Sequence, residues 1–204
     1  AVHQPSGSGS RLDIASSSDG QQAPFTVENR YHSADEQRTL GHETCRYQIE
    51  LLPVGYHLTL DSEFRPVEGE LVFGDQEEMG LGLRLATPLA VDRQQGGRIL
   101  DSAGRLNGAG IWGQSAAWCD YAGPAEGEWV GVTMAAHPDN FRPTRWHARD
   151  YGLLVANPFA LKAFDAGEAS RIAVPAGAAL RLRFAVVVHA TPTGADYNPA
   201  SWLG

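Results

Sequence analysis

The sequence has few cysteines, no long apolar run and fewer basic than acidic residues, and each shortage excludes a class of protein. Two cysteines, Cys45 and Cys119, cannot build a disulfide framework or a site of four thiolate ligands. Both lie in strand-like patterns, so we expect free, buried thiols, with one long-range disulfide as the alternative. No apolar stretch is long enough to span a bilayer, and we therefore expect no membrane partner.

The deficit of basic residues is large enough to limit the partners. The chain has 24 Asp and Glu against 16 Lys and Arg, a formal net charge of -8. Because this charge repels polyanions, we expect no nucleic-acid partner. The chain starts with Ala-Val-His-Gln and shows no basic and apolar leader, so a signal peptide is absent or already removed. The compartment stays open, with an exported or periplasmic location slightly favoured.

The composition along the chain predicts one folded domain between two polar ends. Residues 1–22 are rich in Ser and Gly and predict a flexible arm, because they offer little apolar surface to bury. Residues 193–204 contain Pro, Gly and Asn and predict a C-terminal tail. The intervening residues 23–192 have a length that suits a single β domain with its own core.

Alternation of apolar and polar residues predicts antiparallel strands in this domain. Residues 44–52 are apolar at odd positions, residues 56–64 are mainly apolar at even positions, and the turn-forming Pro53-Val54-Gly55 joins them as a hairpin. We count about nine short strands and find no amphipathic helix longer than two turns. The sequence therefore predicts an all-β fold, an antiparallel β-sandwich.

Residues 137–159 carry the densest set of functional side chains. Read as a strand, this stretch places four donors on one face, because successive side chains point to opposite faces. These donors are Arg145, His147, Arg149 and Tyr151. Their spacing of about 6 to 7 Å matches successive polar groups of a sugar-sized ligand, so we expect a polyhydroxylated or anionic ligand, in the first place a carbohydrate. An imidazole titrates near neutrality, which makes His147 the candidate general acid or base, and Arg149 would stabilise negative charge.

Further candidate site residues flank this stretch. Asp120 and Asp150 are the candidate catalytic carboxylates that would act with His147. Trp112 and Trp118 offer flat rings that could stack on a sugar or, alternatively, pack two sheets together. Additional candidate substrate-binding residues are Arg84, which we expect over a floor of alternating glycines, His137, Asn140, Arg142 and Asn157.

Residues 68–78 contain five acidic side chains with no basic residue between them. Such density predicts a loop that is solvated or paired with Arg, and a calcium site of Asp75, Glu77 and Glu78 is the alternative. A second metal alternative combines His137, His147 and a carboxylate. Neither spacing requires a metal, so we expect no cofactor, and a divalent metal is the weaker alternative.

Three motifs resemble a bacterial family of unknown function that is labelled methane oxygenase PmoA-related. They are the Phe-Gly-Asp-Gln-Glu-Glu-Met-Gly-Leu-Gly-Leu-Arg of residues 73–84, Trp112-Gly113 with the Trp-Cys-Asp-Tyr of 118–121, and the Trp-His-Ala-Arg-Asp-Tyr-Gly of 146–152 with Asn-Pro-Phe at 157–159. The resemblance covers most of residues 25–190 and implies a sandwich related to the supersandwiches of sugar-processing proteins. Members of that family usually carry an earlier His-His-Arg-Gly segment, which we do not find here. The resemblance thus implies a shortened form, a fragment or half of an assembly.

Three classes of function remain open on this basis. The first is a carbohydrate-active enzyme, a hydrolase or lyase, with His147 as general acid or base. The second is a noncatalytic carbohydrate-binding module that uses Trp112 and Trp118. The third is a structural subunit that forms a homo-oligomer through an unpaired sheet edge. An enzyme predicts a pocket where Arg84, His147 and Arg149 meet, whereas a binding module predicts a shallow groove with exposed Trp.

Overall fold

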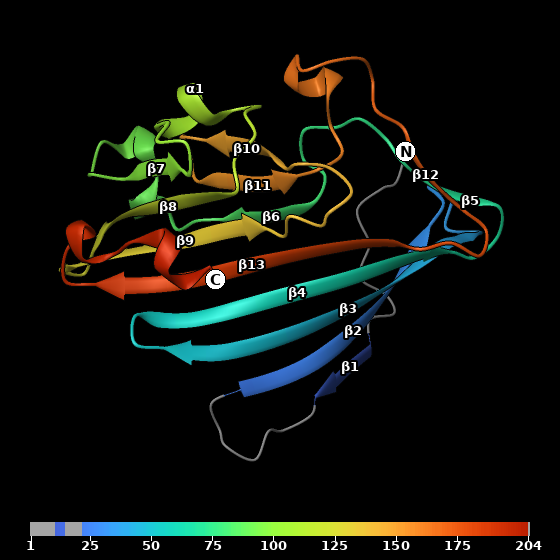
Figure 1. The fold of residues 1–204 in the computed structure, drawn as a ribbon, viewed down its shortest axis with the longest axis horizontal. Helices are drawn as coiled ribbons and strands as arrows, with labels where there is room; N and C mark the ends of the chain where they lie inside the picture. The colour runs from blue at the N-terminus through green and yellow to red at the C-terminus, as the bar shows by residue number, and fades with distance from the viewer. Residues whose placement is uncertain (1–10, 15–21, 204) are drawn as a thin grey trace.

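The computed structural model describes residues 11–14 and 22–203 and has an all-β architecture, an antiparallel β-sandwich (Figure 1). The predicted fold class is confirmed. The described residues form thirteen strands, more than the nine expected. The additional strands are short and lie in segments that were expected to be loops. The strands are β1 (Arg11–Ile14), β2 (Gln22–His32), β3 (Thr39–Leu52), β4 (Gly55–Pro66), β5 (Glu70–Phe73), β6 (Leu81–Arg84), β7 (Arg98–Asp101), β8 (Trp118–Ala125), β9 (Glu128–Ala136), β10 (Arg145–Arg149), β11 (Leu153–Asn157), β12 (Ile172–Pro175) and β13 (Leu180–Thr191).

Helical structure is confined to single turns in the described part of the chain. It comprises α1 (Asn107–Ile111) and the 3-10 helices η1 (Thr87–Leu89), η2 (Val91–Arg93), η3 (Lys162–Phe164), η4 (Gly194–Asp196) and η5 (Pro199–Trp202). None of these helices is long and apolar enough to cross a membrane.

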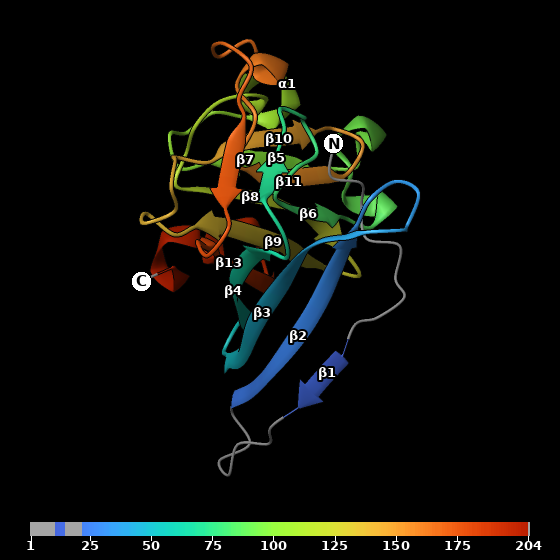
Figure 2. The same ribbon diagram turned by 90° about the vertical axis from the view of Figure 1, so that its right-hand side faces the viewer.

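The strands form one long sheet and two small ones. The long sheet has the order β1-β2-β3-β4-β13-β9-β8-β7, and the small sheets are β10-β11-β6 and β12-β5. The three-stranded sheet lies over the β8 and β9 end of the long sheet, and the β5–β12 pair lies at the other side of the molecule (Figure 1). Strands β1 to β3 extend beyond the part of the long sheet that this second layer covers (Figure 2).

The β3–β4 hairpin gives the long sheet two chemically different faces. Its register pairs Cys45 with Ser62 and Tyr47 with Leu60, as the alternation predicted. We call the face that carries these four side chains the inner face, because it points toward the second layer and forms the core together with residues such as Trp146. The outer face of the same strands carries mainly polar and charged side chains.

The two ends of the chain differ from the expected arm and tail where they are described. Most of residues 1–22 lies outside the described residues, but β1 falls within that range and pairs antiparallel with β2. At the C-terminal end, the ring of Tyr197 stacks on His189 with centroids 3.5 Å apart, and its hydroxyl lies 2.7 Å from Thr133 Oγ1. The segment with η4 and η5 is therefore packed on the outer face of the sheet.

Both cysteines are buried and free, as expected. Cys45 belongs to β3 on the inner face, and Cys119 belongs to β8 and has no exposed surface. Burial raises the pKa of both thiols, so both are protonated at neutral pH.

Candidate functional site

The predicted row of donors on residues 145–151 is shorter than expected, and two of its side chains are engaged by the protein. Strand β10 ends at Arg149, and Tyr151 lies in the turn that follows, so it does not continue the row. Arg145 donates from Nη1 to the carbonyl of Gly113 at 2.7 Å, and His147 is only 2% exposed. These contacts do not support a common ligand site at these side chains, because Arg145 and His147 are engaged by protein groups and Tyr151 does not belong to the strand.

His147 is enclosed by Glu77 and Arg149. Its Nδ1 lies 3.0 Å from Glu77 Oε2, and its Nε2 accepts a hydrogen bond of 3.2 Å from Arg149 Nε. Burial, and then the charge of Arg149, lower the pKa of His147, which makes it a neutral imidazole. Since both ring nitrogens face protein groups, the side chain is poorly placed to exchange a proton with a ligand.

Three of the predicted substrate-binding residues hold loops of the protein instead. Asn157 donates to the carbonyls of Gln76 and Glu77 at 2.7 and 3.0 Å. Asn140 bonds the backbone N–H and carbonyl of Arg183, and Arg142 donates to the carbonyl of Phe159 and to Ser170 Oγ. These side chains satisfy backbone groups of irregular segments, which explains why polar residues are so dense there.

The two candidate carboxylates bind different protein groups, and neither of these bonds involves His147. Asp150 accepts a 2.7 Å hydrogen bond from the N–H of Gly108 at the start of α1. Asp120 is fully buried on the outer face, where its Oδ1 lies 2.9 Å from His189 Nε2. A joint catalytic role of Asp120, Asp150 and His147 is therefore not supported by their positions.

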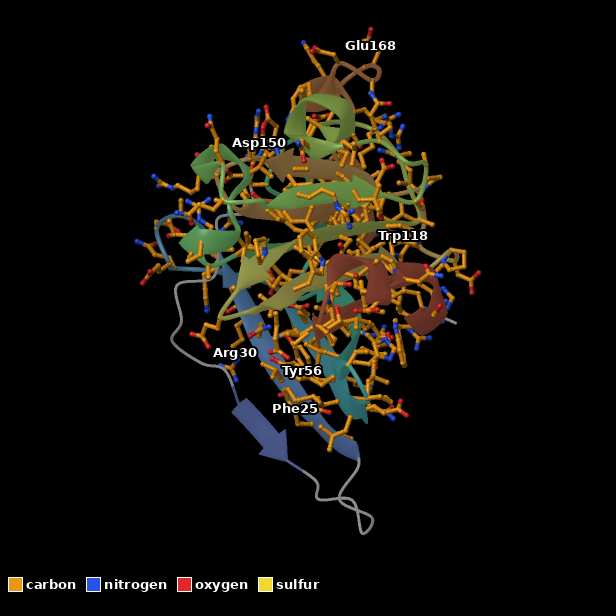
Figure 3. The ribbon with its side chains drawn as sticks, turned by 90° about the vertical axis from the view of Figure 1, so that its left-hand side faces the viewer. Phe25, Arg30, Tyr56, Trp118, Asp150 and Glu168 are labelled. Carbon is orange, nitrogen blue, oxygen red and sulfur yellow. The ribbon has the colours of Figure 1, made fainter. Side chains whose placement is uncertain are left out.

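The remaining predicted residues are spread over the second layer and the sheet rim. The Arg84 guanidinium lies 4.8 Å from the centre of the Tyr151 ring, and the ring of Trp112 packs edge-on against Phe164 at 5.5 Å. Trp118 is half-buried at the start of β8. Figure 3 shows Trp118 and Asp150 in the upper part of the molecule, where the second layer lies over the long sheet. Phe25 and Tyr56 lie in the lower part, on the long sheet.

His137 belongs to a turn and accepts a hydrogen bond from the N–H of Asp139. The described residues contain no group of three or more His, Cys, Asp or Glu side chains arranged to hold a metal ion. The alternatives of a metal at His137 and His147 and of calcium at the acidic loop thus lack a suitable set of ligands.

The acidic loop between β5 and β6 is held by Asp75, whose carboxylate accepts four backbone hydrogen bonds. Oδ2 accepts from the N–H groups of Leu161, Lys162 and Ser170 at 3.1, 3.0 and 2.6 Å, and Oδ1 accepts from Ala163 at 2.8 Å. Burial opposes ionisation, but these bonds outweigh it and lower the pKa of Asp75. Both oxygens are thus engaged by the protein and are not free to bind calcium.

The rest of this loop alternates between two environments. Glu77 forms an ion pair of 2.8 Å with Arg149, as the prediction of an Arg-paired loop required. Gln76 and Glu78 lie on the other side and line a cavity. The loop also needs glycine at its end, because Gly80 has a φ of 105° and a Cβ there would lie 2.1 Å from the carbonyl oxygen of Ala156.

This cavity has a volume of about 540 Å³ and lies between the acidic loop and the inner face of β2, β3, β4 and β13. Side chains of the sheet form its floor, and the acidic loop with Phe159 forms its wall. The lining residues are Tyr31, Glu43, Cys45, Tyr47, Leu60, Ser62, Phe64, Phe73, Gln76, Glu78, Met79, Gly80, Leu81, Phe159, Leu182 and Phe184.

Glu43 is the principal polar group of the cavity floor. The residue is 8% exposed, and its Oε2 accepts hydrogen bonds from Tyr31 Oη at 2.7 Å and from Asn29 Nδ2 at 3.0 Å. Its Oε1 has no hydrogen-bond partner among the residues that the structure describes. Burial, and then the charge of Glu43, raise the pKa of Tyr31, so the phenol keeps its proton and acts as a donor.

Aromatic side chains line the same cavity. Phe64 packs edge-on against Phe73 at 5.3 Å, and Phe73 stacks on Phe159 at 4.8 Å. Tyr47 stacks on Phe25 with centroids 4.6 Å apart. The cavity thus combines flat apolar surfaces with a buried acceptor, the composition typical of sites for small molecules.

This site is not among those predicted from the sequence, although the sequence contains two signals for it. Glu43 shares the odd positions of Cys45 and Tyr47, so a carboxylate lies on the apolar face of an alternating strand. Ser62 is likewise a polar residue among the even positions of the next strand. A polar group at an apolar position of a half-buried strand is unusual unless it is satisfied or functional.

Comparisons with known proteins give one match. The model of a family of unknown function matches residues 3–202, and nothing supports the methane oxygenase label that the motifs suggested. No curated protein and no solved structure matches the chain.

Proposed function

This chain belongs to DUF6807, a family of unknown function, and we propose that it binds a carbohydrate in the cavity on the inner face of the long sheet. The observation that carries this proposal is a buried carboxylate, Glu43, in the lining of an aromatic-lined cavity of about 540 Å³, with hydrogen bonds from the described residues to one of its two oxygens alone. That volume falls within the range of about 300 to 1,000 Å³ that is usual for small-molecule sites.

A carbohydrate fits because it presents both kinds of surface that the cavity can contact. The C–H faces of a pyranose ring would pack on rings such as Tyr47 and Phe64, and its hydroxyls would donate to Glu43 Oε1. Gln76 and Ser62 offer further hydrogen bonds. A purely apolar ligand would offer no donor to Glu43 Oε1 and would bind less well.

Hydrolysis of a glycosidic bond is the second candidate function, and it is favoured by the presence of two carboxylates in one cavity. Glu43 belongs to the floor and Glu78 to the wall. A pair of carboxyl groups on either side of a glycosidic bond is what most glycosidases use as acid and as base or nucleophile. In this proposal Glu43 takes the role first assigned to His147.

Isothermal titration calorimetry with a panel of neutral monosaccharides and disaccharides tests the binding proposal. We expect saturable binding by the wild-type protein, and roughly 2- to 13-fold weaker binding after Tyr47→Ala, because an aromatic contact contributes about 0.5 to 1.5 kcal/mol beyond the area it buries. The second variant is Glu43→Gln, and its matched control is Glu50→Gln. Glu50 is an exposed carboxylate on the same strand, β3, but its side chain points to the outer face.

Glu43→Gln separates the two candidate functions. If the protein is a glycosidase, this variant should lose turnover of the bound disaccharide and retain measurable binding. If the protein only binds, product formation is absent in both proteins. Failure of every sugar in the panel to bind at millimolar concentration would rule out the site.

A further inference from the structure

The charge of the cavity points to one class of carbohydrate. Among the described residues that line it, two are carboxylates, Glu43 and Glu78, and none is Lys, Arg or His. The arginines of the neighbouring strands lie elsewhere: Arg181 pairs with Asp61, and Arg183 pairs with Asp139. Arg149 of β10 pairs with Glu77 of the acidic loop, and neither residue is part of the cavity lining. The electrostatic potential inside the cavity is therefore negative.

Among the residues that the structure describes, the donors to the buried carboxylate are neutral. Tyr31 and Asn29 donate the two hydrogen bonds that Glu43 accepts from the described residues, and neither carries a positive charge. A buried carboxylate without a cation is costly, because its charge is removed from water without full compensation. A ligand that brings a positive charge to Oε1 would supply that compensation, whereas an anionic ligand would add repulsion.

The aromatic lining favours the same charge. The faces of Tyr31, Tyr47 and Phe64 carry negative electrostatic potential and attract cations within about 6 Å. A bare metal ion does not fit as well, because the described residues offer no group of three or more His, Cys, Asp or Glu ligands. A ligand with an ammonium group on an apolar ring framework would fit this lining. Its charge would pair with the carboxylate, and its framework would pack on the aromatic rings.

We propose that the cavity selects amino sugars with a free, protonated amine over neutral sugars, and that it rejects uronates. This inference rests on the proposed carbohydrate function. The ammonium group would lie beside Glu43 Oε1, and the ring would pack on the aromatic floor. This proposal replaces the expectation of an anionic ligand. That expectation depended on Arg145 and Arg149, and neither residue lines the cavity.

Calorimetric titration of the wild-type protein with glucosamine, glucose and glucuronate tests the selectivity. The titrations are made at about pH 6, below the ordinary pKa of an α-amino group, so that the amine is charged. We expect glucosamine to bind at least tenfold more tightly than glucose, and glucuronate to bind most weakly. The advantage of glucosamine should shrink with added salt, because screening weakens the charge interaction.

Variants locate the selectivity within the cavity. Glu43→Gln should bring the affinity for glucosamine down to that for glucose, whereas Glu50→Gln should leave the ratio unchanged. Glu78→Gln, a change at the exposed rim, should reduce the ratio by a smaller factor. Because the ratio is first measured on the wild-type protein, the inference stays testable even if Glu43→Gln does not fold.

The outcomes separate this inference from the proposal on which it depends. If none of the three sugars and no sugar of the neutral panel binds, the proposed function fails. If a sugar of that panel binds and glucosamine does not, the selectivity is refuted and the carbohydrate function stands. If glucose or glucuronate binds as tightly as glucosamine, the selectivity is refuted and the carbohydrate function stands. If Glu43→Gln is folded and keeps the full preference for glucosamine, the charge recognition does not lie at Glu43 and the inference is overturned.

Discussion

Removal of the Asp75 carboxylate should destabilise the protein, because this one side chain joins the acidic loop to the segment between β11 and β12. It accepts four backbone hydrogen bonds, and three of the four bonds are partly buried. In Asp75→Ala these N–H groups lose their acceptor. In Asp75→Asn at least one of them faces an amide N–H instead of an oxygen.

The expected magnitude follows from the number of buried bonds. A hydrogen bond contributes about 0.5 to 1.5 kcal/mol of net stability, and somewhat more when one partner is charged. Three partly buried bonds thus correspond to a loss of about 3 kcal/mol for Asp75→Ala, and we expect a smaller loss for Asp75→Asn. For a domain of this size, roughly 2 to 4 °C in Tm corresponds to each kcal/mol, so Asp75→Ala should lower Tm by roughly 6 to 12 °C.

Thermal unfolding followed by circular dichroism measures this loss. Asp165→Asn is the control for Asp75→Asn, because Asp165 is an exposed residue of the same segment and no hydrogen bond of its side chain is found among the described residues. A Tm of Asp75→Ala within 2 °C of the wild-type value would refute the reasoning.

The pH dependence of the same difference provides a second check. The pKa of Asp75 is lowered in the folded protein, so its stabilising contribution is fully present above the ordinary pKa of about 3.9 and is lost as the pH falls through the lower folded value. The difference in stability between wild type and Asp75→Asn should be constant from about pH 5 to 8 and should shrink below about pH 4. A difference that persists unchanged in acid would contradict the assigned role.

Two further predictions concern groups that are almost fully buried. Asp120→Ala should cost about 3 to 5 kcal/mol in urea denaturation, because it leaves His189 buried without its carboxylate partner; a loss below 1 kcal/mol would mean that the pair contributes little. Cys45 and Cys119 should react with a thiol reagent only as fast as the protein unfolds, since both are buried and their pKa values are raised. In denaturant both should react at once, and rapid labelling of two thiols in the native protein would contradict their burial.

The hairpin of β3 and β4 could be predicted from sequence because its signal is local. Alternation in residues 44–52 and 56–64 depends only on which side chains point to the core, and a turn between adjacent strands fixes the pairing. The pairing of β13 with both β4 and β9 could not be predicted in this way, because these strands are far apart in the chain and many partners satisfy the same alternation.

The site was harder to predict, because a polar motif in the sequence does not show which groups its side chains bind in the folded protein. Arg149 and Glu77 are 72 positions apart, and only the fold brings them within 2.8 Å. Arg149 could therefore be read equally well as a ligand contact or as an internal ion pair. Asn157 is a similar case: a donor that looked available for a sugar in fact binds the backbone of the acidic loop.

The wall of the cavity is held at three separate side chains, Asp75, Glu77 and Asn157. A ligand would therefore meet a binding surface that is already assembled, and no segment would need to close over it. Association should then occur in a single step, with an observed rate that rises linearly with ligand concentration and reaches no plateau. Differences in affinity among related ligands would arise mainly from how long each one stays bound.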